Sequence, residues 1–313
     1  MNIVRIKKTA VVCLFFFPLC LCAQDCVIPI TVQLDEDFSQ LPTPANSSLY
    51  ETLCRIASNN GLTTESPTNQ FVLTAHCDVI DKSVLPGPPV KIVNNIALTL
   101  YVADIFTKKR FSSTYVSLNG VGASEQKSLI NAFQQLSPKA STIESFINDS
   151  KKKILRYYDT SYPEIIKEAK RMVVTKKYEE ALALLLSIPN CSEGAAAAQQ
   201  YALQVYQMHI DRVNLFLYNK AKAIWSSSPI QSSAVEACSM LAQIDPEASS
   251  YNEAQQLMSE IKAKIKDDIH FEMRKKYSDR IELEKERISS ARAIGVAYGK
   301  GQKEQTTNLM WLK

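Results

Sequence analysis

Few residues of this chain combine the type and the spacing that catalysis or metal binding requires. The chain has 313 residues, with only three histidines and eight cysteines. His76 lies beside Cys77 in an alternating segment, so the two side chains point to opposite faces, and neither His209 nor His270 is followed by a second ligand four residues later. Zinc sites need several such ligands close together. The sequence therefore predicts no zinc site.

The segment Gly120-Val121-Gly122 is the best candidate for binding phosphate, because a helix that starts after such a turn presents free backbone amides. The dinucleotide fingerprint needs a third glycine at position 125, where this chain has Glu125. The Gly-Lys-Ser or Gly-Lys-Thr end of a P-loop is also absent. We interpret the segment as a tight turn in which Ser124 caps the next helix.

Other catalytic and ligand signals are weak. Asp35-Glu36-Asp37 lacks the glycine and the spacing of a calcium loop, which favours a solvated turn. No serine lies in a Gly-x-Ser-x-Gly elbow. The chain has 36 Lys and Arg against 32 Asp and Glu, which is too small an excess to indicate a polyanion-binding protein. We predict no enzymatic activity, no cofactor, no metal and no nucleic-acid partner.

The first 23 residues, MNIVRIKKTAVVCLFFFPLCLCA, have the order of basic, apolar and small residues that is typical of a secretory signal peptide. Their apolar run of about 14 residues is shorter than the roughly 20 that span a bilayer. An uncleaved anchor is the alternative, and leucine before Cys20 and Cys22 disfavours a lipoprotein signal. We expect cleavage after Ala23, no transmembrane span in the product, and export to the periplasm or the outer-membrane periphery.

Export would place five cysteines in an oxidising compartment, where disulfides persist. The five are Cys26, Cys54, Cys77, Cys191 and Cys238. An odd number leaves at least one unpaired, and the sequence does not fix the pairing. Cys54 and Cys77 both point toward one predicted core, so they are a candidate disulfide, although two buried free thiols fit the pattern equally well.

Residues 24–138 read as a small α+β domain. Alternating or β-branched segments predict strands at 26–34, 70–85, 91–106 and 111–118, and helical spacing predicts helices at 46–59 and 124–136. The turn Thr107–Arg110 would join the last two strands as a hairpin. The resulting order is β-α-β-β-β-α, with helices packed against a largely antiparallel sheet.

Residues 96–136 also carry a resemblance. The matching positions are Asp104, Phe111, Gly120, Gly122, Ser124 and Ala132. They resemble a bacterial envelope domain shared in outline by the TolB amino-terminal region, the curli-secretion lipoprotein and the flagellar T-ring protein FlgT. The resemblance covers roughly residues 26–137, and it implies a non-enzymatic role in envelope assembly through protein contacts. It supplies no catalytic residue.

Residues 139–249 show helical spacing throughout. Breaks are predicted at 161–163, 189–190, 226–229 and 245–246, where proline and serine cluster. Small residues at the expected offsets resemble two degenerate tetratricopeptide (TPR) units: Ala169 and Ala181 in the first, Ala234 and Cys238 in the second. An ordinary helical bundle is the alternative.

Residues 250–313 are predicted to form one long charged amphipathic helix, over about 250–292, and a tail with Gly295-x-x-x-Gly299. The apolar stripe of this helix is either packed on the preceding helices or offered to a partner. We name Ile261, Ile265, Ile269, Met273 and Tyr277 as the candidate interaction surface.

Taken together, these features predict an exported, non-enzymatic adaptor or scaffold of a bacterial cell-envelope assembly. It would act through contacts with other envelope proteins or through self-association. The alternative is a module that binds cell-wall glycan or another extracellular ligand through the α+β domain. The domain boundary is expected near Pro138–Thr142, where the last helix of the sheet domain ends in Ser137-Pro138.

Overall fold

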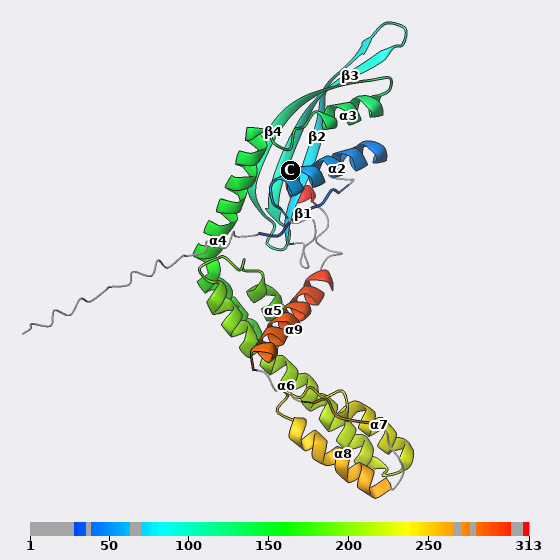
Figure 1. The fold of residues 1–313 in the computed structure, drawn as a ribbon, viewed down its shortest axis with the longest axis vertical. Coiled ribbons are helices and arrows are strands. Elements are labelled where there is room, and N and C mark those ends of the chain that lie inside the picture. The colour runs from blue at the N-terminus through cyan, green and yellow to red at the C-terminus, as the bar shows by residue number, and fades with distance from the viewer. Residues whose placement is uncertain are drawn as a thin grey trace, which may run out of the picture.

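The computed structural model describes residues 28–35, 39–62, 70–265, 271–275, 280–301 and 309–312. The molecule is an elongated bow (Figure 1). A sheet with its covering helices forms one end, a small group of helices forms the other, and long helices connect the two ends. The mixed α+β fold predicted from the sequence is confirmed.

The sheet has four strands in the order β1-β2-β3-β4. Their bounds are Ile30–Val32, Phe71–Leu85, Lys91–Asp104 and Lys109–Gly122. β1 pairs with β2 in parallel, and the other two pairs are antiparallel hairpins. Helix α2 (Thr43–Asn59) follows β1, and α3 (Glu125–Gln134) follows β4, so the predicted order β-α-β-β-β-α is correct.

The two faces of the sheet are covered differently. Phe71, Leu73 and Ala75 of β2 point into the main hydrophobic core beneath the helices. The opposite face packs against the short helix η1 (Met310–Leu312) and the residue before it. Leu309 and Leu312 lie there against Val72, Tyr101, Ala103 and Ile105. Arg110 Nη1 donates to the Leu312 carbonyl oxygen at 3.1 Å. The carboxy-terminal residues therefore lie against the base of the sheet.

The glycines of the Gly120-x-Gly122 segment allow β4 and α3 to pack backbone to backbone. A Cβ atom at Gly120 would lie 1.8 Å from the Ser128 carbonyl oxygen, and one at Gly122 would lie 2.4 Å from the Ser128 nitrogen. Ser124 Oγ accepts a hydrogen bond from the Lys127 amide at 3.2 Å, as predicted for the helix cap. The Lys127 and Ser128 amides at this helix start are thus used within the fold.

Helix α4 (Ser141–Val174) links the sheet to the helical region without interruption. The break predicted at 161–163 is wrong, because Pro163 lies inside this helix. Proline in a helix interior normally costs about 3 kcal/mol. Here Tyr158 on one side of Pro163 and Ala169 on the other are both buried in the same core. That packing holds the helix together across the proline.

In the described residues that follow, the chain forms α5 (Tyr178–Leu186), α6 (Ala195–Ser227), α7 (Gln231–Leu241), α8 (Tyr251–Ile265) and α9 (Arg280–Gly301). The breaks predicted at 189–190 and 245–246 fall between helices, and the one predicted at 226–229 overlaps the last two residues of α6, which ends at Ser227. α4 packs on α5 and α6 on α7, and α9 turns back to lie along α5 and α6 (Figure 1).

The single long helix predicted over 250–292 is wrong. α8 ends at Ile265, residues 271–275 have no regular secondary structure, and α9 begins only at Arg280. α9 packs through small residues rather than through a continuation of the large apolar stripe. Ala291 is buried, and a Cβ atom at Gly295 would lie 3.1 Å from the Ala183 Cα of α5. Gly295 of the Gly295-x-x-x-Gly299 segment therefore allows a close backbone approach within this chain.

The hydrophobic interior is divided at a place that the sequence did not predict. The first core contains the sheet, α2 to α5, the first half of α6 as far as Ile210, and Ala291 of α9. It has members on both sides of Pro138–Thr142, where the domain boundary is expected from the sequence. The second core begins at Leu217 and contains α7 and α8. Residues 211–216 of α6 belong to neither core, and we call them the waist.

One side of the waist is polar and hydrogen-bonded. Asn214 Oδ1 accepts from the Asp245 amide at 2.8 Å, and Asp211 Oδ1 accepts from the Ser249 amide at 2.7 Å. Gln207 Nε2 donates to the Glu247 carbonyl oxygen at 3.0 Å. These bonds fix the loop between α7 and α8 against α6, so a polar layer separates the two cores.

Candidate functional site

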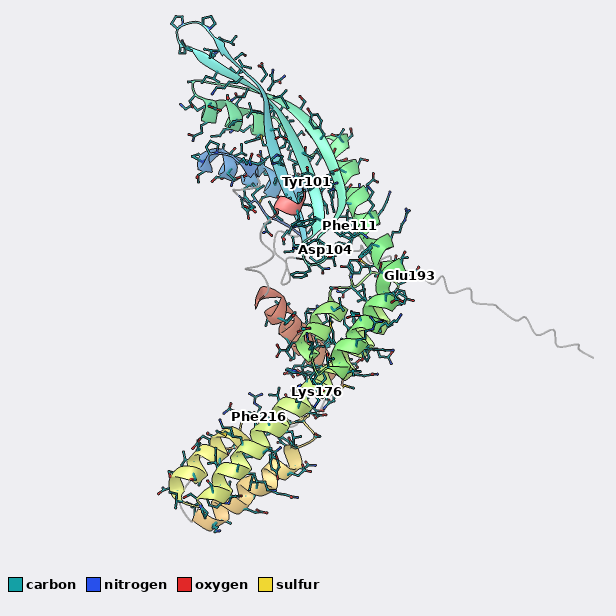
Figure 2. All side chains as sticks on the ribbon, turned by 180° about the vertical axis from the view of Figure 1, so that it is seen from behind. Tyr101, Asp104, Phe111, Lys176, Glu193 and Phe216 are labelled. Atoms are coloured by element: carbon teal, nitrogen blue, oxygen red, sulfur yellow. The ribbon has the colours of Figure 1, made fainter. Side chains whose placement is uncertain are left out.

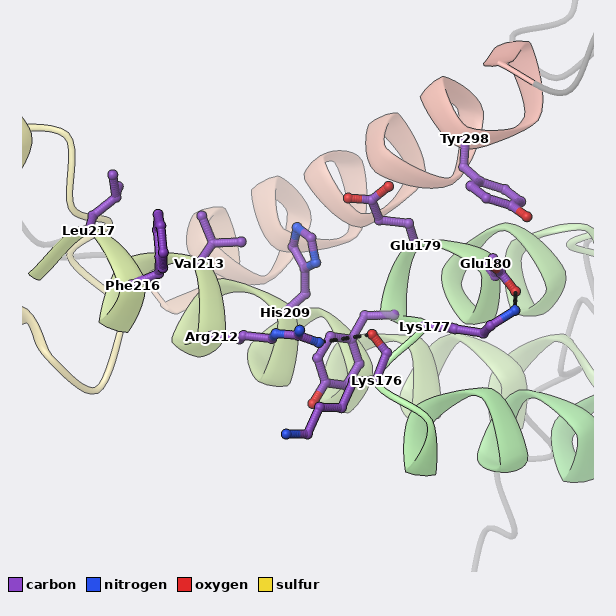
Figure 3. Close-up of a pocket in the computed structure, with 11 residues that line it drawn as sticks. Lys176, Lys177, Glu179, Glu180, His209, Arg212, Val213, Phe216, Leu217 and Tyr298 are labelled. Carbon is purple, nitrogen blue, oxygen red and sulfur yellow. Dashed lines mark hydrogen bonds and ion pairs between the residues drawn. The ribbon is translucent and has the colours of Figure 1, made fainter. Parts of the chain in front are cut away.

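A cavity of about 490 Å³ lies beside the waist, on the side away from the polar layer. The turn between α4 and α5, the middle of α6 and the end of α9 form its walls (Figure 3). Its lining combines basic, acidic and apolar side chains: Lys176, Lys177, Tyr178, Glu179, Glu180, His209, Arg212, Val213, Phe216, Leu217 and Tyr298. Figure 2 places Lys176 and Phe216 at the narrow middle of the bow. We call this cavity the waist pocket.

The basic wall of the waist pocket is built on the α4–α5 turn. Lys176 adopts φ +62°, the left-handed conformation that commonly ends a helix. Its carbonyl oxygen accepts a hydrogen bond from Arg212 Nη1 at 3.1 Å, and the guanidinium lies 5.9 Å from the Tyr178 ring centre. Arg212 is thus held in place from two sides while its side chain stays exposed.

His209 lies in the middle of the pocket, 6.3 Å from the Tyr178 ring. Partial burial lowers the pKa of His209 from its usual value, the Arg212 charge lowers it further, and the Glu179 charge opposes both. The imidazole is therefore neutral at neutral pH. Lys177 Nζ forms an ion pair with Glu180 Oε2 at 3.1 Å, so these two charges offset each other.

Four lining residues of α6 form one helical stripe. His209, Arg212, Val213 and Phe216 follow the i, i+3, i+4, i+7 spacing that places side chains on one face. Phe216 is 68% exposed and Val213 is 44% exposed. A cation thus lies between apolar groups on a helix face that neither hydrophobic core covers. The spacing was visible in the sequence, but our search for ligand pairs and active-site motifs did not detect it.

A second, more apolar cavity of about 300 Å³ adjoins the waist pocket and shares Glu180 and Tyr298 with it. Phe106, Met172 and Ala183 line its interior. It lies where the base of the sheet meets α5 and α9, and Gly299 faces Phe106 there. This junction holds the sheet and the helices in a fixed relation.

A buried polar cluster stabilises the same junction. Asp104 Oδ2 accepts hydrogen bonds from Gln70 Nε2 at 2.9 Å and from the Tyr158 hydroxyl at 2.8 Å. Asp104 Oδ1 accepts from the backbone amides of Phe106 and Thr107 at 2.8 and 3.0 Å. Burial, together with the nearby carboxylate, raises the pKa of Tyr158, which therefore stays protonated and donates. All these groups are used within the fold, so we assign the cluster a structural role.

The far end of the β2–β3 hairpin projects beyond the helices as an arm, residues 79–90 (Figure 1). Its exposed apolar side chains are Val79 at 45%, Ile80 at 66%, Val84 at 58%, Leu85 at 49% and Val90 at 55%. In the described part of the chain, β1 pairs only with Phe71–Leu73, so the outer edge of β2 is open along the arm. Lys82 Nζ pairs with Glu125 of α3 at 2.5 Å and braces the arm at its base.

The candidate interaction surface predicted on the long helix is not exposed as a stripe. Ile261 is fully buried, and Ile265 and Met273 pack against the second core. Ile269 and Tyr277 lie outside the described residues. The stripe therefore serves internal packing where it is described, which was the alternative stated for it.

The candidate disulfide between Cys54 and Cys77 is wrong, because both residues are free thiols. Cys77 is buried, and burial raises its pKa to about 12, so it stays protonated and unreactive. Cys238 is buried and free as well, whereas Cys191 is disulfide-bonded. Cys26 lies outside the described residues.

The remaining polar candidates do not converge on a site. His76 Nε2 lies 3.1 Å from Asp78 Oδ1, and Asp35 Oδ2 accepts from the Leu309 amide at 3.1 Å. Glu36, Asp37 and His270 lie outside the described residues. Within the described ranges, no group of His, Cys, Asp and Glu is arranged to hold a metal ion. The described helices also include none with the length and apolar character needed to cross a membrane.

Comparison of the chain with protein-family models, with curated proteins and with solved structures yields no significant match.

Proposed function

We propose that this protein is an exported, non-enzymatic adaptor of a bacterial cell envelope, which binds other envelope proteins and uses the β2–β3 arm as its main contact. The arm carries this proposal. β4 pairs with β3 as far as Ile92, so β2 is the edge strand along the arm, and an open apolar strand edge favours association. Five exposed aliphatic side chains on one such arm fit a surface that a protein partner covers.

The tip of the arm supports a controlled contact rather than random aggregation. Pro86, Pro88 and Pro89 form the turn, and proline at a sheet edge blocks unspecific strand addition. The bend at Ile80, where the β2–β3 register shifts, also restricts flat edge-to-edge pairing. Both features let a partner of matching shape bind while other strands are disfavoured.

Four further observations support the location and the architecture. The amino-terminal sequence has the order of a signal peptide, and a disulfide at Cys191 suits an oxidising compartment. The strand order suits the envelope-domain resemblance of residues 26–137. Ala169, Ala181, Ala234 and Cys238 are all fully buried where paired helices meet, which suits a TPR-like arrangement of α4 with α5 and of α6 with α7.

Site-specific photocross-linking in living cells tests this proposal. A photoreactive amino acid replaces Ile80 on the arm, and a matched control replaces Tyr115 of β4, which is 61% exposed on the same sheet. We expect the arm position to yield a discrete product with an envelope protein, identified by mass spectrometry, and the control position to yield none. Equal labelling at both positions, or a product only with cytoplasmic proteins, would contradict the proposal. Retention of unlinked protein on purified cell-wall glycan would favour a glycan-binding module instead.

A further inference from the structure

The waist pocket contains two cations that are available to a ligand. Within the described ranges, neither Lys176 nor Arg212 forms an ion pair, whereas Lys177 is paired with Glu180. Arg212 uses one N–H group on the Lys176 carbonyl oxygen, and a guanidinium has five donors. Figure 3 shows Arg212 and Glu179 on opposite sides of His209. A carboxylate beside Arg212 would therefore avoid the acidic side of the pocket.

The apolar part of the pocket lies one helical turn from this cation. Phe216 follows Arg212 by four residues, a rise of about 6 Å along α6. Val213 and Leu217 line the same wall, and the Phe216 ring is mostly exposed. The two positions are thus about 6 Å apart along the helix backbone, and a ligand that fits both features must carry an apolar group and a negative charge.

An extended polypeptide has this spacing. Side chains two residues apart point to the same side and are separated by about 6.6 Å. Arginine binds a carboxylate with directed, charge-assisted hydrogen bonds, and the fixed position of Arg212 reduces the entropy lost on binding. The pocket also lies on the surface at the narrow middle of the bow, where a passing chain can reach it.

We infer that the waist pocket binds an extended segment of a partner polypeptide, in which a bulky apolar side chain and a carboxylate stand two residues apart. Arg212 and Lys176 bind the carboxylate, and Val213, Phe216 and Leu217 receive the apolar side chain. This inference rests on the proposed adaptor function and adds the chemistry of a second contact, remote from the arm.

Fluorescence anisotropy with labelled peptides tests the inference. The probe is Gly-Phe-Ser-Asp-Gly with blocked ends, and the two control peptides replace Asp by Asn or Phe by Ser. We expect the purified protein to bind the probe at least about ten-fold more tightly than either control peptide. Added salt should weaken the binding, because the carboxylate contact is exposed.

Three variants make the test specific. Arg212→Gln and Phe216→Ser should each lower the affinity for the probe to that of the control peptides. Lys220→Gln removes an exposed cation of the same helix that does not line the pocket, and it should leave binding unchanged. Because all three side chains are exposed, thermal melting should show that the variants stay folded.

The outcomes separate this inference from the proposed function. Equal binding of all three peptides, or equal effects of Arg212→Gln and Lys220→Gln, would overturn the inference. So would Arg212-dependent binding to phosphatidylglycerol vesicles without any binding of the probe. If the probe fails while the photoreactive group at position 80 still yields an envelope partner, the pocket assignment is wrong and the adaptor function stands. If the probe binds and position 80 yields no partner, the pocket assignment stands and the proposed use of the arm is wrong.

Discussion

The two hydrophobic cores differ in how they are assembled from the chain. The first draws on distant parts of the sequence, from Ile28 in the amino-terminal half to Ala291 in α9. The second is local, formed by residues 217–273. α6 belongs to both, and its waist lies between them. The second core is therefore an insertion between α6 and α9 rather than the end of a linear array.

This difference shows that a domain boundary can lie within a continuous helix. Pro138 looks like a linker in the sequence, but Phe133 and Leu136 before it and Ile143 after it all enter the first core. The waist contains neither proline nor glycine, and its helix is regular. What marks the boundary is the change in side-chain surroundings, with a polar layer on one side and an exposed stripe on the other.

The largest effect is expected from Asp104→Ala in the first core. The substitution leaves the Tyr158 hydroxyl and two backbone amides without their acceptor, and Gln70 Nε2 keeps only the Tyr158 oxygen. Each buried unsatisfied donor costs about 1 to 3 kcal/mol, and the site as a whole about 3 to 5 kcal/mol. Calorimetry should show the unfolding transition of the first core shifted down and that of the second core nearly unchanged. A uniform shift of both transitions would show that the cores are one cooperative unit.

Leu241→Ala is the matched change in the second core. Leu241 is fully buried there, and truncation of such a residue costs about 2 to 5 kcal/mol. We expect the transition of the second core to move to lower temperature while peptide binding at the waist pocket persists at temperatures below it. Loss of probe binding at those temperatures would show that the pocket depends on the second core.

Asn214→Ala should weaken the connection between the cores. It removes the acceptor of the Asp245 amide and one donor to α6, a loss of about 1 kcal/mol. We expect the two calorimetric transitions to separate further, because the polar layer transmits stability from one core to the other. Leu215→Ala, an exposed change in the same helix turn, is the control. If both variants separate the two calorimetric transitions equally, the α6 backbone, and not the polar layer, couples the stabilities of the two cores.

The smallest effect concerns pH. Because the folded state lowers the pKa of His209 below its usual value of 6.5, the unfolded chain binds a proton more readily. The stability of the first core should therefore fall as the pH drops through about 6.5. Melting at about pH 7.5 and about pH 5.5 measures this difference. His209→Gln should reduce the pH dependence of the first transition, and an unchanged dependence would exclude His209 as its source.

Much of the sheet domain was predictable, because apolar and β-branched residues recur at every second position of the strands. The residues that enter the core from β2 and β3 were visible as an apolar series: Phe71, Leu73, Ala75, Cys77, Ile96, Leu98 and Leu100. The arm was predicted as strand, but its exposure was not, because Val79 and Val84 have the same residue type as buried positions. Which part of the sheet is buried depends on how far α2 and α3 extend over it in the folded protein.

The helical region was less predictable at its boundaries. Pro163 suggested a break that long-range packing of Tyr158 and Ala169 prevents. Regular spacing from Ala254 to Ile281 suggested one helix, yet Ile281 is 68% exposed and belongs to α9. The waist pocket was missed because its residues come from three separate elements. One part of it, the stripe of His209, Arg212, Val213 and Phe216, was detectable as helical spacing.

The central claim is that the first core folds without the second, and an internal deletion tests it most directly. Residues 217–279 are replaced by a Gly-Ser linker of about ten residues, which joins the waist to α9. Hydrogen-exchange mass spectrometry then compares peptides from β2 and β3 in the deletion variant and in the full chain. We predict the same strong amide protection in both, because all partners of these strands in the first core remain. Loss of that protection would contradict the account and show that the two cores fold as one.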